Sequence, residues 1–350
     1  MQPDTNRCQG MEWLVLDGQL LVLVIFLLFG ACIGVVSSML GIGGGTLLVP
    51  LLVVMFLFTP RSASAVSLMA AVFVSLSSTV SYSRQRPRPI LYGTGLMLMS
   101  VTVPGSMAGA WLGTYLQGID ENILRYVFAA VLFPIALKMA FSVSRGKAED
   151  VKTELEEFRA HGTTRGAVMA TLIGAFTAGV LSGLLGIGGG VVIVPLLTLV
   201  MRVPMHTAVA TSMFTMVFTT LSGTVTNVLL GEISMVPVGD LALGTAIYGT
   251  AVGAGMLLGA PVGCKLACRV GSSRLKSAFG ILLIYPVLRM ARLGDVITGS
   301  VSYVASTLAE LGLWALVAVL TLIVRARLVR SKRQTAGDAS DAECKTSQSF

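Results

Sequence analysis

Residues 34–52 read GVVSSMLGIGGGTLLVPLL, and residues 179–197 repeat the pattern as GVLSGLLGIGGGVVIVPLL. Each copy is an apolar segment, a Gly-Ile-Gly-Gly-Gly break and a short apolar segment that contains a proline. The second copy begins 145 residues after the first, at Gly179 instead of Gly34. The chain is therefore predicted to contain two copies of one unit, each built around a glycine break.

The composition indicates an integral membrane protein. Hydrophobic residues make up 54% of the chain and charged residues 12%, whereas a soluble domain carries about 25% charged residues. The net charge is +8, but the basic residues lie in short connections and in the tail, which indicates membrane topology rather than nucleic-acid binding. We expect a multi-pass protein in a lipid bilayer, with no nucleic-acid partner and with homo-oligomerisation left open.

No metal or cofactor is expected. The five cysteines form no Cys-x-x-Cys pair. Cys264 and Cys268 would share a helix face, but two thiols without a histidine make a poor metal site, so a role as small packing residues is favoured.

The first half divides into a polar lead and one membrane repeat. The apolar run from about residue 18 continues past a weak cleavage-like site into the repeated motif, so it is interpreted as an uncleaved membrane segment. The segment after the glycines, residues 46–58, is about 20 Å long as a helix and too short to span comfortably. The predicted parts are a lead (1–17) and a first repeat (18–143) with segments at about 18–40, 62–83, 90–116 and 123–143.

The second half repeats the first. Ala65-Val-Ser67 matches Ala210-Thr-Ser212, and the glycine ladder of Gly105, Gly109 and Gly113 returns as Gly255, Gly259 and Gly263; such spacing allows close helix contact. The predicted parts are a polar linker (144–166), the second repeat (167–291), an extra C-terminal membrane segment (296–324) and a basic, partly disordered tail (325–350).

The loop charges favour opposite topologies for the two repeats. Arg84, Arg86 and Arg88 follow the Ser-rich segment of the first half, whereas the charged residues of the equivalent connection 231–240 are Glu232 and Asp240. Basic loops prefer the cytoplasm. The fold class is therefore predicted as all-α, with two inverted repeats and re-entrant or broken helices at the glycine motifs; parallel repeats are the alternative.

The glycine breaks are the candidate substrate site. A run of glycines is a poor helix former, at up to about 1 kcal/mol per residue relative to alanine, and unwound backbone at membrane depth needs a protein or wet environment. Two helix N-termini meeting there would bind an anion without a buried cation. The simpler alternative is tight helix packing alone. The predicted binding residues are Gly41, Gly43, Gly44, Gly45, Gly186, Gly188, Gly189 and Gly190.

Polar side chains of the Ser-rich segments are candidate partners of the substrate. Hydroxyls and amides can donate to an anion without burying charge, although Ser and Thr in membrane helices commonly bond their own backbone instead. The candidates are Ser67, Ser212, Thr79, Thr224 and Asn227, with Pro50 and Pro195 as hinges and Arg61 and His206 as charges at the two mouths. The mouth residues have an alternative role as interfacial helix-end charges.

The duplicated Gly34…Gly41-Ile-Gly-Gly-Gly45…Val49-Pro50-Leu51 motif, its second copy, the Ala-x-Ser that follows each, and the ladder helices resemble the TauE/SafE sulfite exporter family over residues 20–291. The resemblance implies a polytopic permease for small anions such as sulfite, sulfoacetate or other sulfonates.

The leading functional hypothesis is a secondary transporter of small anions that works by alternating access between the repeats. An intramembrane enzyme is disfavoured because neither histidine lies inside a segment and Gly179-Val-Leu-Ser182-Gly183 has the wrong protease spacing. A non-transporting scaffold would need a soluble domain or a long signalling tail. For coupling, Glu310 in the extra segment is the candidate carboxylate.

Overall fold

The computed structural model describes residues 5–56, 58–85, 89–117, 165–233 and 245–269, with single positions at 130, 133–134 and 319. The chain divides into two compact units, and all the helices described below belong to the first, residues 1–128 and 148–272. Apart from these single positions, the predicted crossing at 123–143, the extra segment 296–324, the tail 325–350 and nearly all of the linker 144–166 lie outside the described residues.

Every regular element in these ranges is a helix. Six of the helices contain stretches long and apolar enough to cross a membrane, as expected for a multi-pass membrane protein. The elements are α1 (Thr5–Leu40), α2 (Gly45–Met55), α3 (Pro60–Ser83), α4 (Tyr92–Gln117), α7 (Arg165–Leu185), α8 (Gly190–Pro195), the π-helical turn η1 (Leu196–Val200), α9 (Met205–Leu229) and α10 (Thr245–Arg269).

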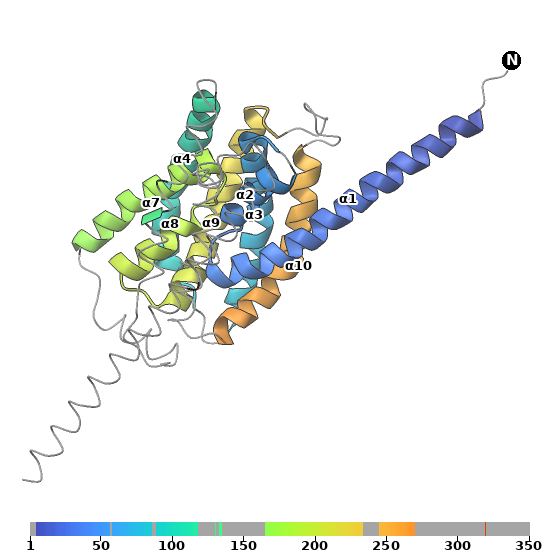
Figure 1. The fold of residues 1–350 in the computed structure, drawn as a ribbon. Helices are drawn as coiled ribbons and strands as arrows, with labels where there is room; N and C mark the ends of the chain where they lie inside the picture. The colour runs from blue at the N-terminus through green and yellow to red at the C-terminus, as the bar shows by residue number, and fades with distance from the viewer. Residues whose placement is uncertain are drawn as a thin grey trace, which may run out of the picture. The chain divides into compact units, whose positions relative to one another are not determined.

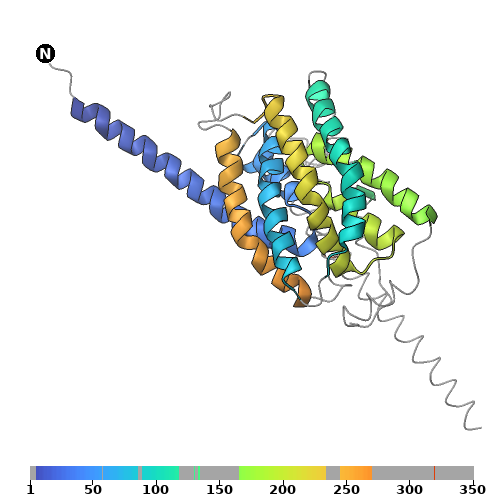
Figure 2. The ribbon, with the colours of Figure 1, turned by 180° about the vertical axis from the view of Figure 1, so that it is seen from behind.

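The two repeats interlock through their outer helices. Figure 2 shows α10, α3, α9 and α4 side by side in one row, with α3 and α9 in the middle. Helix α1 packs against α10, and α7 packs against α4 (Figure 1). Because α1 and α7 are repeat equivalents, as are α4 and α10, the first helix of each repeat packs against the last described helix of the other.

The glycine ladders make these contacts possible. A Cβ atom at Gly255 or Gly259 of α10 would overlap the backbone of α1, and one at Gly109 of α4 would overlap the backbone of α7 at Val180. The prediction that the ladder spacing allows close helix approach is therefore confirmed at both helix pairs.

The glycine motif interrupts the helix in each repeat. Helix α1 ends at Leu40 and α2 begins at Gly45, and α7 ends at Leu185 before α8 begins at Gly190. Helix α2 has 11 residues, about 17 Å of helix, which is well short of the roughly 30 Å of hydrocarbon. The predicted breaks thus occur where the sequence placed them.

Replacing Gly259 by leucine is expected to destabilise the contact of α1 with α10. The new side chain meets backbone atoms of Ala31 and Val35, which cannot move aside as a side-chain end can, and overpacking costs about 1–3 kcal/mol. Thermal unfolding of the detergent-solubilised protein should show a lower midpoint than for Gly93→Leu, because Gly93 has open space around it. Equal midpoints for the two variants would contradict this account.

Candidate functional site

The two glycine breaks share an unusual backbone conformation. Three glycines of the first break have positive φ, at 75° for Gly41, 75° for Gly43 and 82° for Gly44. Their equivalents Gly186, Gly188 and Gly189 have φ of 73°, 79° and 81°. This left-handed region costs other residues roughly 1–2 kcal/mol, which explains why both breaks use glycine at the same three places.

The breaks lie directly against each other. A Cβ atom at Gly45 would lie 2.6 Å from the Cα atom of Ile187, and one at Gly190 would overlap the carbonyl oxygen of Gly41. Residues 40–50 are all buried, as are residues 184–191. The fourth glycine of each motif therefore has normal φ but is required because the opposite break occupies the place of a side chain.

A serine of each repeat forms a hydrogen bond with the break of the other repeat. The hydroxyl of Ser67 in α3 donates to the carbonyl of Gly186 at 2.8 Å. The hydroxyl of its repeat equivalent Ser212 in α9 donates to the carbonyl of Gly41 at 3.1 Å. The structure thus brings these two predicted residues to the breaks, where they satisfy carbonyl groups of the unwound backbone.

Both short helices start without a side-chain cap. The cap residues are Gly44 and Gly189, and neither offers a hydrogen bond from a side chain. In the first break the amides of Leu47 and Leu48 bond to the carbonyl of Gly44, and the second break repeats this with the carbonyl of Gly189. The amides of the first two residues of each helix are left without an intrahelical acceptor.

Met216 of α9 fills the space between the two breaks. A Cβ atom at Gly43 would overlap the terminal methyl of Met216, and one at Gly188 would lie 2.5 Å from the same methyl. Met216 is fully buried. Its repeat equivalent in α3 is Ala71, so the plug comes from one repeat only. The glycine face is therefore occupied by a flexible side chain in this conformation.

Two serines that the sequence reasoning missed also lie at the breaks. Ser37 of α1 and Ser182 of α7 are repeat equivalents, both fully buried, and the hydroxyl of each lacks a hydrogen-bond partner. The Ser37 oxygen lies 3.5 Å from the Cβ position of Gly44, and the Ser182 Cβ lies 3.5 Å from that of Gly189. Their duplication three residues ahead of each -Leu-Gly-Ile-Gly motif was a signal in the sequence.

The remaining polar candidates form no hydrogen bond with the breaks. Thr79 follows Ser67 by twelve residues in α3, and Thr224 follows Ser212 by twelve residues in α9, a distance of about 18 Å along a helix. The hydroxyls of both threonines are buried without a partner. Asn227, one turn beyond Thr224, instead accepts a hydrogen bond from Arg61 and donates to the carbonyl of Gly223.

The predicted mouth charges are both buried. Arg61 in the first turn of α3 is 2% exposed, and His206 in the first turn of α9 is 8% exposed. Arg61 forms an ion pair with Glu232, which the sequence placed in a loop.

The two predicted hinge prolines lie within the short arms. Pro50 lies inside α2, and Pro195 ends α8, where the chain continues as the π-helical turn η1. Each proline removes one backbone donor from its arm.

The site offers amide and hydroxyl donors rather than metal ligands. Among the described residues, no group of three or more His, Cys, Asp or Glu side chains lies together as metal ligands would. Donor groups of this kind, next to helix starts, suit a small anion.

The chain is similar to several proteins that are named as probable membrane transporters. The chain is 28% identical over 273 residues to the probable membrane transporter protein YunE of Bacillus subtilis, covering 75% of this chain and 94% of that protein. It is 27% identical over 275 residues to the probable membrane transporter protein YdhB of the same organism, covering 76% of this chain and all of that protein. A third relative is the probable membrane transporter protein MJ0441 of Methanocaldococcus jannaschii, with 30% identity over 197 residues, 55% of this chain and 68% of that protein.

No solved structure matches the chain. The family model described as "Sulfite exporter TauE/SafE" matches residues 26–290, a range that begins inside α1 and includes both glycine breaks. Together with the six membrane-competent helices, this match identifies a multi-pass integral membrane protein. The chain belongs to the sulfite exporter TauE/SafE family of membrane transporters.

Proposed function

We propose that this protein is a secondary transporter of small anions, with sulfite and organic sulfonates as the substrate class, and that it binds the anion between the two glycine breaks. The observation that carries the proposal is the contact of the two breaks, each followed by a helix without a side-chain cap. Small oxyanions are good ligands for backbone amides at helix starts. The family name supports the sulfur-oxyanion class.

Several neutral donors surround this position. The hydroxyls of Ser37 and Ser182 lack partners, and those of Ser67 and Ser212 bond to break carbonyls. A hydroxyl that changes its acceptor from a carbonyl to an anion keeps its hydrogen bond, so substrate entry and exit need not leave it buried without a partner.

Movement of the two repeats relative to each other would expose the site alternately to the two sides. We propose that the repeats are inverted, so that each break approaches the middle of the membrane from its own face. The exchanged contacts, α1 on α10 and α7 on α4, support a coupled movement because the first helix of each repeat is packed against the other repeat. In this account Met216 must leave the space between Gly43 and Gly188 when the substrate binds.

Leucine at Gly44 or Gly189 is expected to abolish transport while the protein still inserts into the membrane. Either side chain would fill the cap position of a short helix and impose strain where φ is 82° or 81°. Uptake of labelled sulfite and methanesulfonate into proteoliposomes measures the effect, with Gly93→Leu as a control of the same size change. Normal flux in both break variants would rule out the anion site.

Shortening Met216 to alanine is expected to increase the flux of bulkier sulfonates relative to sulfite. The variant makes the second repeat resemble the first, where Ala71 stands at this position, and it removes the methyl that contacts both breaks. Competition between benzenesulfonate and labelled sulfite should become stronger by about tenfold, as expected for relief of a steric penalty near 1.4 kcal/mol. Met213→Ala removes another fully buried methionine of the same helix and serves as the control. Unchanged selectivity of the Met216 variant would contradict the role of Met216 as a plug.

Inversion of the repeats predicts that residues 86 and 233 face opposite sides of the membrane. Single cysteines at these positions, in a background without the five native cysteines, should react with a membrane-impermeant thiol reagent from opposite sides of oriented vesicles. Position 86 is expected to be cytoplasmic because its connection carries three arginines. Labelling of both positions from the same side would reject inversion.

A further inference from the structure

Arg61 is a buried charge at an unfavourable place. It occupies the first turn of α3, which begins after the cap residue Thr59 and Pro60, and it is 2% exposed. A helix start carries partial positive charge, so a cation there is disfavoured and an anion is favoured. A charged side chain inside a membrane protein also needs a partner, and the partner here is Glu232.

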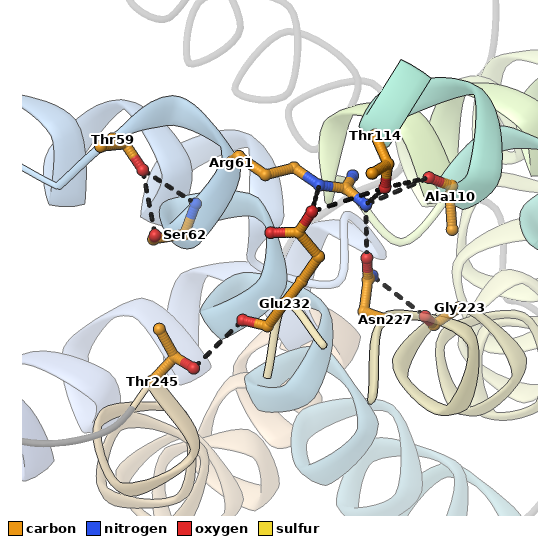
Figure 3. A network of polar contacts seen from close by, with 9 residues as sticks. All are labelled: Thr59, Arg61, Ser62, Ala110, Thr114, Gly223, Asn227, Glu232 and Thr245. Carbon is orange, nitrogen blue, oxygen red and sulfur yellow. Dashed lines mark hydrogen bonds and ion pairs between the residues drawn. The ribbon is translucent and has the colours of Figure 1, made fainter. Parts of the chain in front are cut away.

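The guanidinium group is anchored through one nitrogen only. Figure 3 shows Nη2 of Arg61 donating to three acceptors: the carbonyl of Ala110 at 3.1 Å, the hydroxyl of Thr114 at 2.8 Å and the amide oxygen of Asn227 at 2.8 Å. Nη1 is buried and has no hydrogen-bond partner. It lies 2.6 Å from the place where a Cβ atom at Gly113 would be. The side chain is thus held firmly while donor capacity remains unused.

Glu232 makes only a loose contact with this group. Its Oε1 atom lies 3.4 Å from Nε of Arg61 and 3.5 Å from the hydroxyl of Thr114. A well-formed bidentate pair of arginine and carboxylate would have two contacts of about 2.7–2.9 Å. The side chain of Glu232 is 22% exposed against 2% for Arg61, so Glu232 lies between the buried cation and the outside of the protein.

The backbone of Glu232 is better fixed than its carboxylate. Its amide donates to the carbonyl of Asn227 at 2.9 Å, and its carbonyl accepts from the hydroxyl of Thr245 at 3.2 Å (Figure 3). The carboxylate can therefore leave Arg61 by side-chain rotation, without a change in the end of α9.

Unsatisfied donors connect Arg61 with the second glycine break. Ser64, one turn further along α3 or about 5 Å, is buried with an unpartnered hydroxyl. That hydroxyl lies 2.5 Å from the Cβ position of Gly186. The Cβ position of Gly113 is 2.6 Å from Nη1 of Arg61 and 3.5 Å from the carbonyl of Leu184, just before the same break.

We propose that Arg61 is a second anion-binding station on the path to the glycine breaks, and that Glu232 is its exchangeable counter-ion. This inference rests on the proposed function. When the station is empty, Arg61 and ionised Glu232 neutralise each other. When a monovalent anion binds to Arg61, Glu232 takes up one proton from water and moves aside, so the buried site again has zero net charge. One proton is therefore bound with each monovalent anion.

The direction of the pH effect follows from this exchange. Protonated Glu232 releases Arg61, so anion affinity is highest at low pH and falls as Glu232 ionises. Arg61 is the charged side chain that faces Glu232 from α3, whereas α4 and α10 present the hydroxyls of Thr114 and Thr245. His206, the titratable residue of α9, lies 26 residues before Glu232, about 39 Å if measured along a helix, and does not share the site.

The test uses Glu232→Gln, which keeps the size of the side chain and mimics its neutral form. The probe is methanesulfonate, because it remains a monovalent anion at every working pH, whereas sulfite titrates. For the wild type, the KM for uptake into proteoliposomes should rise about tenfold per pH unit over the range in which Glu232 is ionised, and a pH dye should report co-transported protons. For Glu232→Gln, the KM should be independent of pH and proton movement should be lost.

Matched variants separate this inference from a structural role. Arg84→Gln removes an exposed charge at the other end of α3 and should leave the pH profile unchanged. Gly113→Ala places a methyl group against Nη1 of Arg61 and should raise the KM about tenfold with little change in the maximal rate; it provides the test if Glu232→Gln does not fold.

Failure of the inference and failure of the proposed function give different results. If the wild type transports methanesulfonate but Glu232→Gln retains the wild-type pH profile and proton movement, the station is wrong and Glu232 serves only to hold the helices together. An unchanged KM in Gly113→Ala would also overturn the proposed anion-binding station at Arg61. If the wild type moves neither methanesulfonate nor sulfite at any pH, the proposed function itself fails.

Discussion

The structure depends on backbone groups that the two repeats satisfy for each other. Unwound backbone inside a membrane is costly unless its carbonyls and amides find partners. Each glycine break exposes such groups, and the serine that bonds the Gly186 carbonyl belongs to the first repeat while the one that bonds Gly41 belongs to the second. Neither break is therefore complete within its own repeat. The mutual contact of Gly45 with Ile187 and of Gly190 with Gly41 fixes the two breaks at one place, and any substrate site built from them must be shared.

The helix breaks and the close helix contacts could be predicted from the sequence, because both depend on the spacing of nearby residues. Three consecutive glycines and a later proline indicated a helix break, and the helices end at Leu40 and Leu185 as that reading requires. The four-residue glycine ladders predicted close helix contact without saying which helices meet. The exchange of partners, α1 with α10 and α7 with α4, is a property of the folded chain and could not be obtained from spacing alone.

The side chains of the candidate site were less predictable, because the sequence does not show which of them lie close together in the fold. Ser67 and Ser212 were predicted as substrate donors and lie at the breaks, yet in this conformation they bond to carbonyl oxygens. Thr79, Thr224 and Asn227 have similar chemistry but form no hydrogen bond with the breaks. Met216 carried no polar signal in the sequence, and only the fold shows that its methyl group lies between Gly43 and Gly188. Glu232 was assigned to a loop, and the sequence did not show that it forms an ion pair with Arg61.

The departures from repeat symmetry are as informative as the symmetry itself. An inverted-repeat transporter with two fully equivalent halves would have the same energy when open to either side. Here the equivalent of Met216 is Ala71, and the equivalent of Arg61 is His206. In the proposed alternating-access cycle, a methionine from one repeat and a permanent cation near one break give the two open states different energies, because each state exposes a different half. In the proposed mechanism the glycine motifs supply a shared place to bind an anion, and the unmatched residues make its two approaches unequal.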